Sequence, residues 1–193
     1  MALPPLDPKR TAVLVIDMQR DFLDPGAPIE TPGGRAIIPA INRLTARARA
    51  LGIPVVFTQE MHRADKSDFG IELQFEPPHC LEGTPGMELA ERLEVAPTDY
   101  RIMGKRRYDA FLGTDLETLL RGLRAENLIV AGVCTDVCVT STVQHARNLD
   151  FRCVVPRECV AGTAPERHEA ALLCLGHVFG YVVSLPEVEA ALR

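Results

Sequence analysis

Short runs of apolar and β-branched residues recur along this sequence, and they constrain the fold more than any other feature. The first run, Ala12 to Ile16, contains no polar residue and is followed by Asp17. An unbroken apolar run of this length is typical of a strand buried on both faces of a parallel sheet, because a half-exposed strand would alternate with polar residues. Similar runs cover residues 54–58, 127–132, 151–155 and 181–184, and a shorter apolar stretch covers residues 100–103.

The segments between these runs have the periodicity of helices. They cover residues 35–51, 115–124, 136–148 and 165–177. This alternation indicates βαβ units, since two parallel strands need a crossover connection between them. We therefore predict an α/β fold: a three-layer α/β/α sandwich, Rossmann-like, around a doubly wound and mostly parallel sheet of six strands. A chain of 193 residues fits one such unit, so we expect a single domain that spans residues 1–193.

A long segment, residues 59–86, interrupts the alternation. It contains several prolines and glycines among scattered apolar residues. A loop of this length inside a compact domain is more often a lid or a binding segment than a spacer, although a simple insertion would give the same pattern. We therefore expect residues 59–86 to form a lid or active-site loop.

Composition argues against two kinds of partner. The formal charge of -5 does not favour binding to a phosphate backbone, and the one dense basic group, Lys105 to Arg107, is more typical of a solvated turn. No apolar run reaches the roughly 20 residues that cross a bilayer. We therefore expect no nucleic-acid partner and no membrane segment.

The cysteines and the first residues bear on the cellular compartment. The first ten residues lack the apolar stretch of a secretory signal, which leads us to expect a cytoplasmic protein. The chain has six cysteines, and in the cytoplasm most of them should be reduced. The sequence is therefore compatible with a reactive thiol.

Two strands end in side chains that suit chemistry. In doubly wound sheets, ligands bind beyond the carboxyl ends of the strands. Asp17 closes the first strand, where an unpaired buried carboxylate would be costly, so it either caps a turn or faces a polar crevice. Cys134 and Cys138 follow the strand that ends at Gly132.

Cys138 has physical reasons to be a nucleophile. Thr135 or Asp136 suits the N-cap of the following helix, which places Cys138 in the first turn. Free N–H groups and the helix dipole favour a thiolate there, and the same N–H groups suit an oxyanion. Two other interpretations are open. A free cysteine is commonly just a small buried residue, and a zinc site at Cys134 and Cys138 would need a second pair of ligands that the spacing does not offer.

Lys105 follows the apolar stretch at residues 100–103. A lysine beside a cysteine lowers the pKa of the thiol, and a nearby carboxylate can accept the thiol proton. Spacing alone does not distinguish Lys105 from its neighbours Arg106 and Arg107.

Three segments, taken together and in this order, resemble the isochorismatase-like cysteine hydrolases. They read VIDMQRDF (15–22), KRRYDAF (105–111) and GVCTDVCV (132–139). The family includes nicotinamidases, N-carbamoylsarcosine amidase, biuret hydrolase and ureidoacrylate amidohydrolase. Weaker similarity runs through residues 37–42 and 79–86, so the resemblance covers much of the chain.

The resemblance implies a catalytic triad of Asp17, Lys105 and Cys138. It also implies a cis peptide bond between Val133 and Cys134, and an oxyanion hole formed by the backbone amides of Cys134 and Cys138. In the implied mechanism Asp17 accepts the thiol proton, Lys105 stabilises the thiolate, and the sulfur attacks a small amide or ureido substrate. A thioester forms, ammonia or an amine leaves, and no cofactor is required.

The resemblance leaves the substrate open. Some relatives without the nucleophilic cysteine hydrolyse a vinyl ether, so Cys138 favours the amide branch. Nicotinamidases hold a metal with an Asp-x-His pair and a further histidine, whereas Glu60 and His62 stand here without a second histidine shortly beyond. We therefore expect no metal and interpret His62 as a lid or ion-pair residue, with a metal-binding enzyme of the nicotinamidase type as the alternative.

The residues expected to wall the substrate pocket are Phe22, Tyr108 and Leu175, together with the 59–86 loop. Biuret hydrolase presents a glutamine where Leu175 stands here, and a leucine cannot hydrogen-bond a ureido group, which argues against biuret. Each of the three side chains would also fit ordinary packing in the core or at a rim.

Two other classes of function remain compatible with the pattern. A catalytically silent binding or scaffold protein would show ordinary thiol reactivity at Cys138. An oxidoreductase that binds a dinucleotide would carry Gly-x-Gly-x-x-Gly after the first strand, where residues 17–20 read DMQR instead. From the resemblance we expect a homodimer or homotetramer that acts on a small amide or ureido molecule.

Overall fold

The fold is built around one parallel sheet. The computed structural model describes residues 2–192. The strands are β1 (Thr11–Ile16), β2 (Val55–Glu60), β3 (Tyr100–Lys105), β4 (Asn127–Val133), β5 (Arg152–Pro156), β6 (Val160–Ala161) and β7 (Gly180–Val183). They form the order β3-β2-β1-β4-β5-β7, and β6 pairs with β4. Every neighbouring pair among these strands is parallel.

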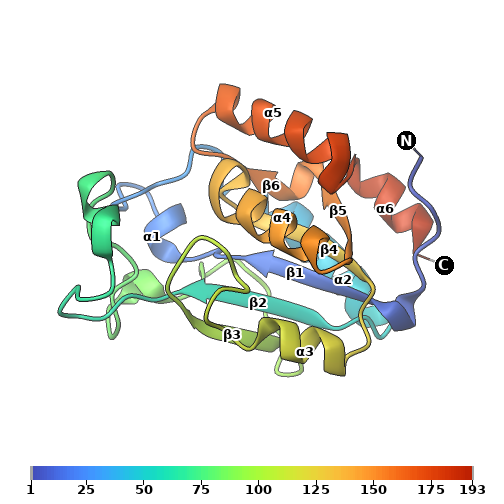
Figure 1. The fold of residues 1–193 in the computed structure, drawn as a ribbon, viewed down its shortest axis with the longest axis horizontal. Coiled ribbons are helices and arrows are strands. Elements are labelled where there is room, and N and C mark those ends of the chain that lie inside the picture. The colour runs from blue at the N-terminus through green and yellow to red at the C-terminus, as the bar shows by residue number, and fades with distance from the viewer. Residues whose placement is uncertain (1, 193) are drawn as a thin grey trace.

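Helices cover both faces of the sheet (Figure 1). The α-helices are α1 (Arg20–Leu23), α2 (Ile38–Ala50), α3 (Leu116–Gly122), α4 (Thr140–Asn148), α5 (Pro165–Cys174) and α6 (Leu185–Ala191). Two π-helical turns are η4 (Thr135–Val139) and η6 (Leu175–Phe179), and the 3-10 turns are η1 (Pro8–Arg10), η2 (Gly70–Gln74), η3 (Pro85–Met87) and η5 (Arg157–Cys159). The buried residues of α2 and α6 belong to one core, and those of α3, α4 and α5 belong to the other.

The alternation of side chains in β1 separates these two cores. Val13 and Val15 pack with α2 and α6, whereas Ala12, Leu14 and Ile16 pack with α3, α4 and α5. Every residue of β1 is buried. A strand covered by helices on both faces has no position for a polar side chain in its middle, which explains the unbroken apolar run.

The predicted α/β class and three-layer arrangement are confirmed, and two details are corrected. The sheet has seven strands and not six, because β6 adds a strand of two residues that is too short to give an apolar run. The loop predicted at residues 59–86 starts too early, since Gln59 and Glu60 are the last residues of β2 and pair with Met103 and Lys105 of β3.

The strand order reverses between β1 and β4. The strands β2 and β3 extend the sheet from β1, and β5 and β7 extend it from β4. In parallel sheets such a reversal opens a crevice at the carboxyl ends of the two central strands, where ligands bind. Asp17 directly follows β1, and Cys134 directly follows β4.

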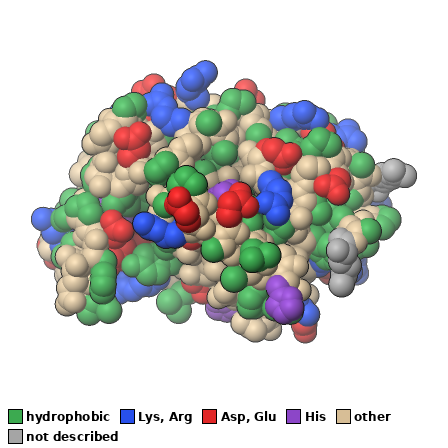
Figure 2. Space-filling model, turned by 90° about the horizontal axis from the view of Figure 1, so that it is seen from above, with side chains coloured by type: hydrophobic (Ala, Val, Ile, Leu, Met, Phe, Trp, Pro, Cys, Tyr) green, Lys and Arg blue, Asp and Glu red, His purple; other side chains and the backbone are tan. Residues whose placement is uncertain are grey.

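Within residues 2–192, no helix is both long and apolar enough to span a bilayer. On the face drawn in Figure 2, acidic and basic side chains are interspersed, and Lys and Arg do not gather into one continuous patch.

Candidate active site

Three segments bring Asp17, Lys105 and Cys138 together at the carboxyl ends of the strands. Asp17 follows β1, Lys105 is the last residue of β3, and Cys138 lies in η4, the turn after β4. Lys105 Nζ lies 2.6 Å from Asp17 Oδ2 and donates to Cys138 Sγ at 3.7 Å. A carboxylate oxygen of Asp17 lies within 4.8 Å of the sulfur. All three side chains are buried, so the carboxyl, the ammonium and the thiol form one compact group.

A close approach of two strands makes this arrangement possible. Gly132 of β4 pairs with Ile16 of β1 and has a φ of +112°. A Cβ at Gly132 would lie 2.1 Å from the carbonyl oxygen of Ile16, so a side chain there would force the strand ends apart. Asp17 has a φ of +48°, a left-handed conformation that turns the chain out of the sheet directly after β1.

Burial and mutual attraction set the charges of this group. Burial alone would lower the pKa of Lys105, but the neighbouring Asp17, Cys138 and Glu60 outweigh it and hold the ammonium pKa well above its ordinary value. For Asp17, burial raises the pKa, and the attraction of Lys105 offsets part of that rise. Lys105 is therefore a fixed positive charge, and Asp17 has the raised proton affinity that suits an acid–base group.

The structure corrects the expectation that Cys138 is a thiol of low pKa. Burial raises the pKa of Cys138 well above its ordinary value, and the attraction of Lys105 opposes that rise without cancelling it. The residue is 3% exposed, and the carboxylates of Asp17 and Glu60 add negative charge beside it. Free N–H groups at a helix terminus favour a thiolate, but the desolvation of a buried sulfur disfavours it. Cys138 therefore rests as a thiol, whose proton has to move to a neighbouring group before the sulfur can attack.

A cavity of about 500 Å³ opens above the thiol. Cys134 and Cys138 line it, and so do the predicted pocket residues Phe22 and Tyr108. The other lining residues are Ile29, Glu30, Thr31, Glu60, Glu72, Phe75, Glu76, His79, Val137, Thr163 and Arg167. A cavity of this size suits a small organic molecule. The buried sulfur is thus accessible from a pocket.

Leu175 does not belong to this cavity. It begins η6, is fully buried and packs in the core that contains α4 and α5. The prediction that Leu175 walls the pocket is therefore wrong. Leu175 points away from the crevice between β1 and β4 because η6 packs against α4 and β7. This packing turns the leucine toward the sheet.

Cys134 is the N-cap residue of η4, and the peptide bond that joins Val133 to it is cis. Its carbonyl accepts hydrogen bonds from the amides of Val137 at 3.0 Å and Val139 at 3.1 Å. Its sulfur lies 3.1 Å from the hydroxyl of Thr31. Burial raises the pKa of the Cys134 thiol to about 12, so Cys134 lines the cavity as a neutral group at physiological pH.

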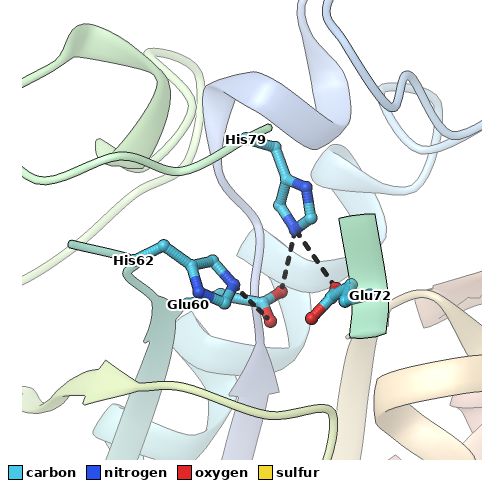
Figure 3. A group of neighbouring side chains, drawn as sticks. All are labelled: Glu60, His62, Glu72 and His79. Carbon is cyan, nitrogen blue, oxygen red and sulfur yellow. Dashed lines mark ion pairs between the residues drawn. The ribbon is translucent and has the colours of Figure 1, made fainter. Parts of the chain in front are cut away.

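Figure 3 shows a second group of buried polar side chains. It consists of Glu60, His62, Glu72 and His79, and one ligand atom from each lies within 4.8 Å of the others. Glu60 joins the two groups, because its Oε2 lies 3.8 Å from Lys105 Nζ and 3.9 Å from His79 Nε2. Burial alone would raise the pKa of Glu60, but Lys105 and the two histidines lower it to about 2. Glu60 is therefore a carboxylate.

The two histidines present the same ring nitrogen to this group. His79 Nδ1 lies 2.8 Å from the carbonyl oxygen of Pro77, and His62 Nδ1 lies 3.3 Å from Asp68 Oδ1. Because a carbonyl or carboxylate oxygen accepts, Nδ1 carries a proton and Nε2 is the nitrogen turned inward. Glu60 Oε1 and His62 Nε2 are buried and lie 3.5 Å apart, and neither atom makes a well-formed hydrogen bond in the part of the chain that is described. Two imidazoles and two carboxylates are a donor set that suits a divalent cation such as Zn²⁺.

The sequence interpretation missed the second histidine of this group. The loop after β2 folds back, so that the rings of His79 and His62 have centroids 5.3 Å apart. The available signal was a histidine in a loop rich in Pro and Gly, after a strand that ends in Glu60. Glu72 carried no signal, because a lone glutamate in a polar loop is usually solvated.

Gln19, in the first of the three matching segments, holds the backbone of Glu60. Its side-chain oxygen accepts from the Glu60 amide at 2.7 Å, and its Nε2 donates to the carbonyls of Glu60 at 2.7 Å and Met87 at 2.9 Å. Gln19 is fully buried. The segment after β1 therefore fixes the end of β2, from which Glu60 reaches both polar groups.

The protein is an α/β protein that groups a carboxyl, an ammonium and a thiol at the carboxyl ends of its parallel strands. A family model described as the Isochorismatase domain matches residues 11–187. N-carbamoylsarcosine amidase from Arthrobacter sp is 33% identical, over 93% of this chain and 70% of its own length. A probable inactive nicotinamidase from Arabidopsis thaliana is 35% identical, over 88% of this chain and 90% of its own. The solved pyrazinamidase of Pyrococcus horikoshii in complex with zinc is 31% identical with a TM-score of 0.83, over 91% of this chain and 99% of that one.

The chain belongs to the isochorismatase family, as the three sequence segments predicted. Its relatives include amidohydrolases that act on carbon–nitrogen bonds other than peptide bonds.

Proposed function

We propose that this protein is a cysteine amidohydrolase that cleaves a carbon–nitrogen bond of a small amide or ureido compound through a thioester. Cys138 is the nucleophile, Asp17 the acid–base residue and Lys105 the fixed cation. The observation that carries the proposal is the 3.7 Å contact between Lys105 Nζ and Cys138 Sγ beneath a cavity, with Asp17 on the same ammonium.

The reaction begins with proton transfer from the Cys138 thiol to the Asp17 carboxylate, because a thiol of raised pKa does not ionise alone at neutral pH. The sulfur then bonds to the substrate carbonyl carbon, and the electron pair of the C=O bond moves onto oxygen. Lys105 offsets the negative charge as it passes from the carboxylate to the sulfur. When the C–N bond breaks, Asp17 gives its proton to the leaving nitrogen, and ammonia or an amine departs.

Hydrolysis of the thioester uses the same groups. Asp17 accepts a proton from water, and the resulting hydroxide bonds to the thioester carbon. The C–S bond then breaks, the sulfur recovers the proton from Asp17, and the carboxylic acid leaves. We assign the oxyanion of both steps to the backbone amides of Cys134 and Cys138, since both residues line the cavity and the first turn of a helix leaves N–H groups without helical acceptors.

The test is an ammonia-release screen with matched variants. The panel contains nicotinamide, pyrazinamide, biuret, maleamate, ureidoacrylate and N-carbamoylsarcosine, with a vinyl ether as the alternative substrate. We expect turnover of at least one amide, a loss of kcat by roughly a thousandfold or more in Cys138→Ala and Asp17→Asn, and normal activity in Cys174→Ala, which changes an exposed thiol. Mass spectrometry after rapid quenching should find the acyl group on Cys138.

Two results would contradict the proposal. Turnover of the vinyl ether but of no amide would make the reaction class wrong. A folded protein that turns over nothing, and whose Cys138 is alkylated no faster than the other buried thiols, would be a catalytically silent binding protein.

A second candidate function is an enzyme of the nicotinamidase type with a bound divalent cation. Two observations favour it: the buried Glu60 Oε1 and His62 Nε2, which face each other without a well-formed hydrogen bond, and the solved relative in complex with zinc. Glu60, His62, Glu72 and His79 are the residues that would hold the ion. When bound there, the ion supplies a Lewis acid at the wall of the cavity, to which Glu60, Glu72 and His79 contribute.

Direct metal measurements separate this candidate from the first. We expect the purified protein, dialysed against Zn²⁺ and then buffer, to retain about one equivalent by elemental analysis. His62→Ala and His79→Ala should weaken Zn²⁺ binding at least tenfold in calorimetric titration, whereas His177→Ala, at an exposed position, should bind like the wild type. Equal binding by all four proteins would eliminate the cluster as the metal site.

A further inference from the structure

Asp17 occupies a position where its side chain needs an outside constraint. It is the first residue after β1, it has a left-handed φ, and it is fully buried. Beyond the end of a strand, no backbone hydrogen bonds of the sheet fix the orientation of the chain. The sheet alone therefore does not determine which carboxylate oxygen of Asp17 faces which neighbour. Partners from neighbouring strands have to decide which oxygen faces the sulfur.

Thr58 of β2 provides such a partner. Its hydroxyl donates to Asp17 Oδ1 at 2.6 Å and accepts from the Asp17 backbone amide at 3.2 Å. A hydroxyl has one proton to donate, so the incoming N–H takes a lone pair and the proton goes to the carboxylate. Thr58 is itself fully buried. One side chain therefore holds both the backbone and the carboxylate of the same residue.

The other carboxylate oxygen of Asp17 faces the Lys105 ammonium. Asp17 Oδ2 lies 2.6 Å from Lys105 Nζ, and no well-formed hydrogen bond to it exists among the described residues. The same ammonium donates to Cys138 Sγ, so Oδ2 and the sulfur face one cation.

We propose that Thr58 is a positioning residue: its hydroxyl occupies Oδ1 of Asp17 and thereby reserves Oδ2 as the atom that exchanges the proton with Cys138. In the acylation step the proton passes from Sγ to Oδ2 while Oδ1 keeps its bond from Thr58. The same proton then passes from Oδ2 to the leaving nitrogen as the C–N bond breaks. The inference rests on the proposed amidohydrolase mechanism and adds a residue to it that does not touch the substrate.

Three variants of Thr58 and one control variant separate this role from simple packing. Thr58→Val keeps the branched shape and removes the hydroxyl. Thr58→Ser and Thr58→Ala differ from each other in the hydroxyl alone, and they provide the comparison if the valine variant does not fold. Thr45→Val is the matched control, because Thr45 is equally buried and its hydroxyl donates to a backbone carbonyl within α2.

The measurement is kcat and KM for a substrate found in the screen, under one metal condition. We expect kcat to fall about 10- to 100-fold in Thr58→Val and Thr58→Ala, as for loss of a hydrogen bond to a charged group, with KM unchanged within about threefold. Thr58→Ser should stay within about threefold of the wild type, and so should Thr45→Val.

The inference is overturned if Thr58→Ser loses as much activity as Thr58→Ala, or if Thr58→Val raises KM and leaves kcat intact. Failure of the underlying mechanism looks different, because Cys138→Ala would then remain active. A wild-type kcat in both Thr58→Val and Thr58→Ala, with Cys138→Ala inactive, would leave the mechanism standing and remove Thr58 from it.

Discussion

Replacing Lys105 by methionine removes an ammonium that lies between two buried carboxylates. The nitrogen is 2.6 Å from Asp17 Oδ2 and 3.8 Å from Glu60 Oε2. At an effective dielectric constant of 20 these contacts are worth about 6 and about 4 kcal/mol of attraction before desolvation is subtracted. Methionine has a similar length and no charge, so the variant keeps the packing and leaves two carboxylates without their cation.

Protonation of the uncompensated carboxylates moderates the loss of stability. A buried carboxylate without its cation takes up a proton, which at pH 7 costs about 4 kcal/mol for a group whose ordinary pKa is near 4. We therefore expect Lys105→Met to lower the free energy of unfolding by about 3–5 kcal/mol, the usual cost of breaking a buried pair from one side. For a chain of this size, that corresponds to a fall in Tm of roughly 6–20 °C.

The pH dependence of the stability of Lys105→Met tests whether the uncompensated carboxylate takes up a proton. In Lys105→Met the folded-state pKa of Asp17 rises further, because burial already raises it and the opposing ammonium is gone. A raised folded-state pKa gives stability that is present at low pH and is lost as pH rises through that pKa. The deficit relative to the wild type should therefore shrink from pH 8 to pH 6, by up to about 1.4 kcal/mol per pH unit for one proton.

Urea unfolding at pH 6, 7 and 8 measures the effect, with Lys9→Met as the control at an exposed lysine. The control should change stability by less than about 0.5 kcal/mol at every pH. A loss below about 1 kcal/mol in Lys105→Met, or a deficit that grows as pH falls, would refute the reasoning.

Three further outcomes are expected. Gly132→Ala should lower the free energy of unfolding by about 4 kcal/mol or prevent folding, because its Cβ would clash with the Ile16 carbonyl. The control Gly122→Ala, which has open space around it, should be neutral or slightly stabilising. Soluble yield and Tm measure both effects. Ellman's reagent at pH 8 should react fastest with the exposed Cys174, more slowly with Cys134 and Cys138, which line the cavity, and with the other three buried thiols only in denaturant. Reaction of Cys80, Cys153 or Cys159 in the native protein would contradict the burial described. Four glutamates and one arginine line the cavity, so the cavity should repel anionic substrates. We expect kcat/KM to be about tenfold or more higher for neutral amides than for amides that carry a carboxylate. A preference for the carboxylate-bearing amides that is lost in Arg167→Ala would contradict this expectation.

The layers of this fold were predictable because their causes are local. The run from Ala12 to Ile16 is apolar at each position since helices cover both faces of β1. The strand β6 and the helix α6 were not predicted. The strand β6 has only two residues, which is too few for a periodic pattern. The helix α6 follows β7 directly, and the capping box at Ser184 is a sequence signal that would have indicated where this helix begins.

The site was predictable where residues close strands and where motifs matched a family. Asp17 was a candidate from its place after β1, whereas Lys105 was separated from its arginine neighbours by the resemblance and not by spacing. The pKa of Cys138 was predicted in the wrong direction, because the burial of a sulfur depends on segments remote in sequence. His79 and Glu72 depend on the way a long loop closes, which no local pattern specifies.

The cavity has a floor and walls of different origin. Its reactive groups stand on strand ends and on the turn after β4, where a shift of one residue would disrupt both cores. Much of the wall belongs to loop segments, and Phe75 of the segment between β2 and β3 is 76% exposed, so exchanging it should cost the folded state little. Substitutions in these loops should therefore change the shape of the cavity without moving Asp17, Lys105 or Cys138.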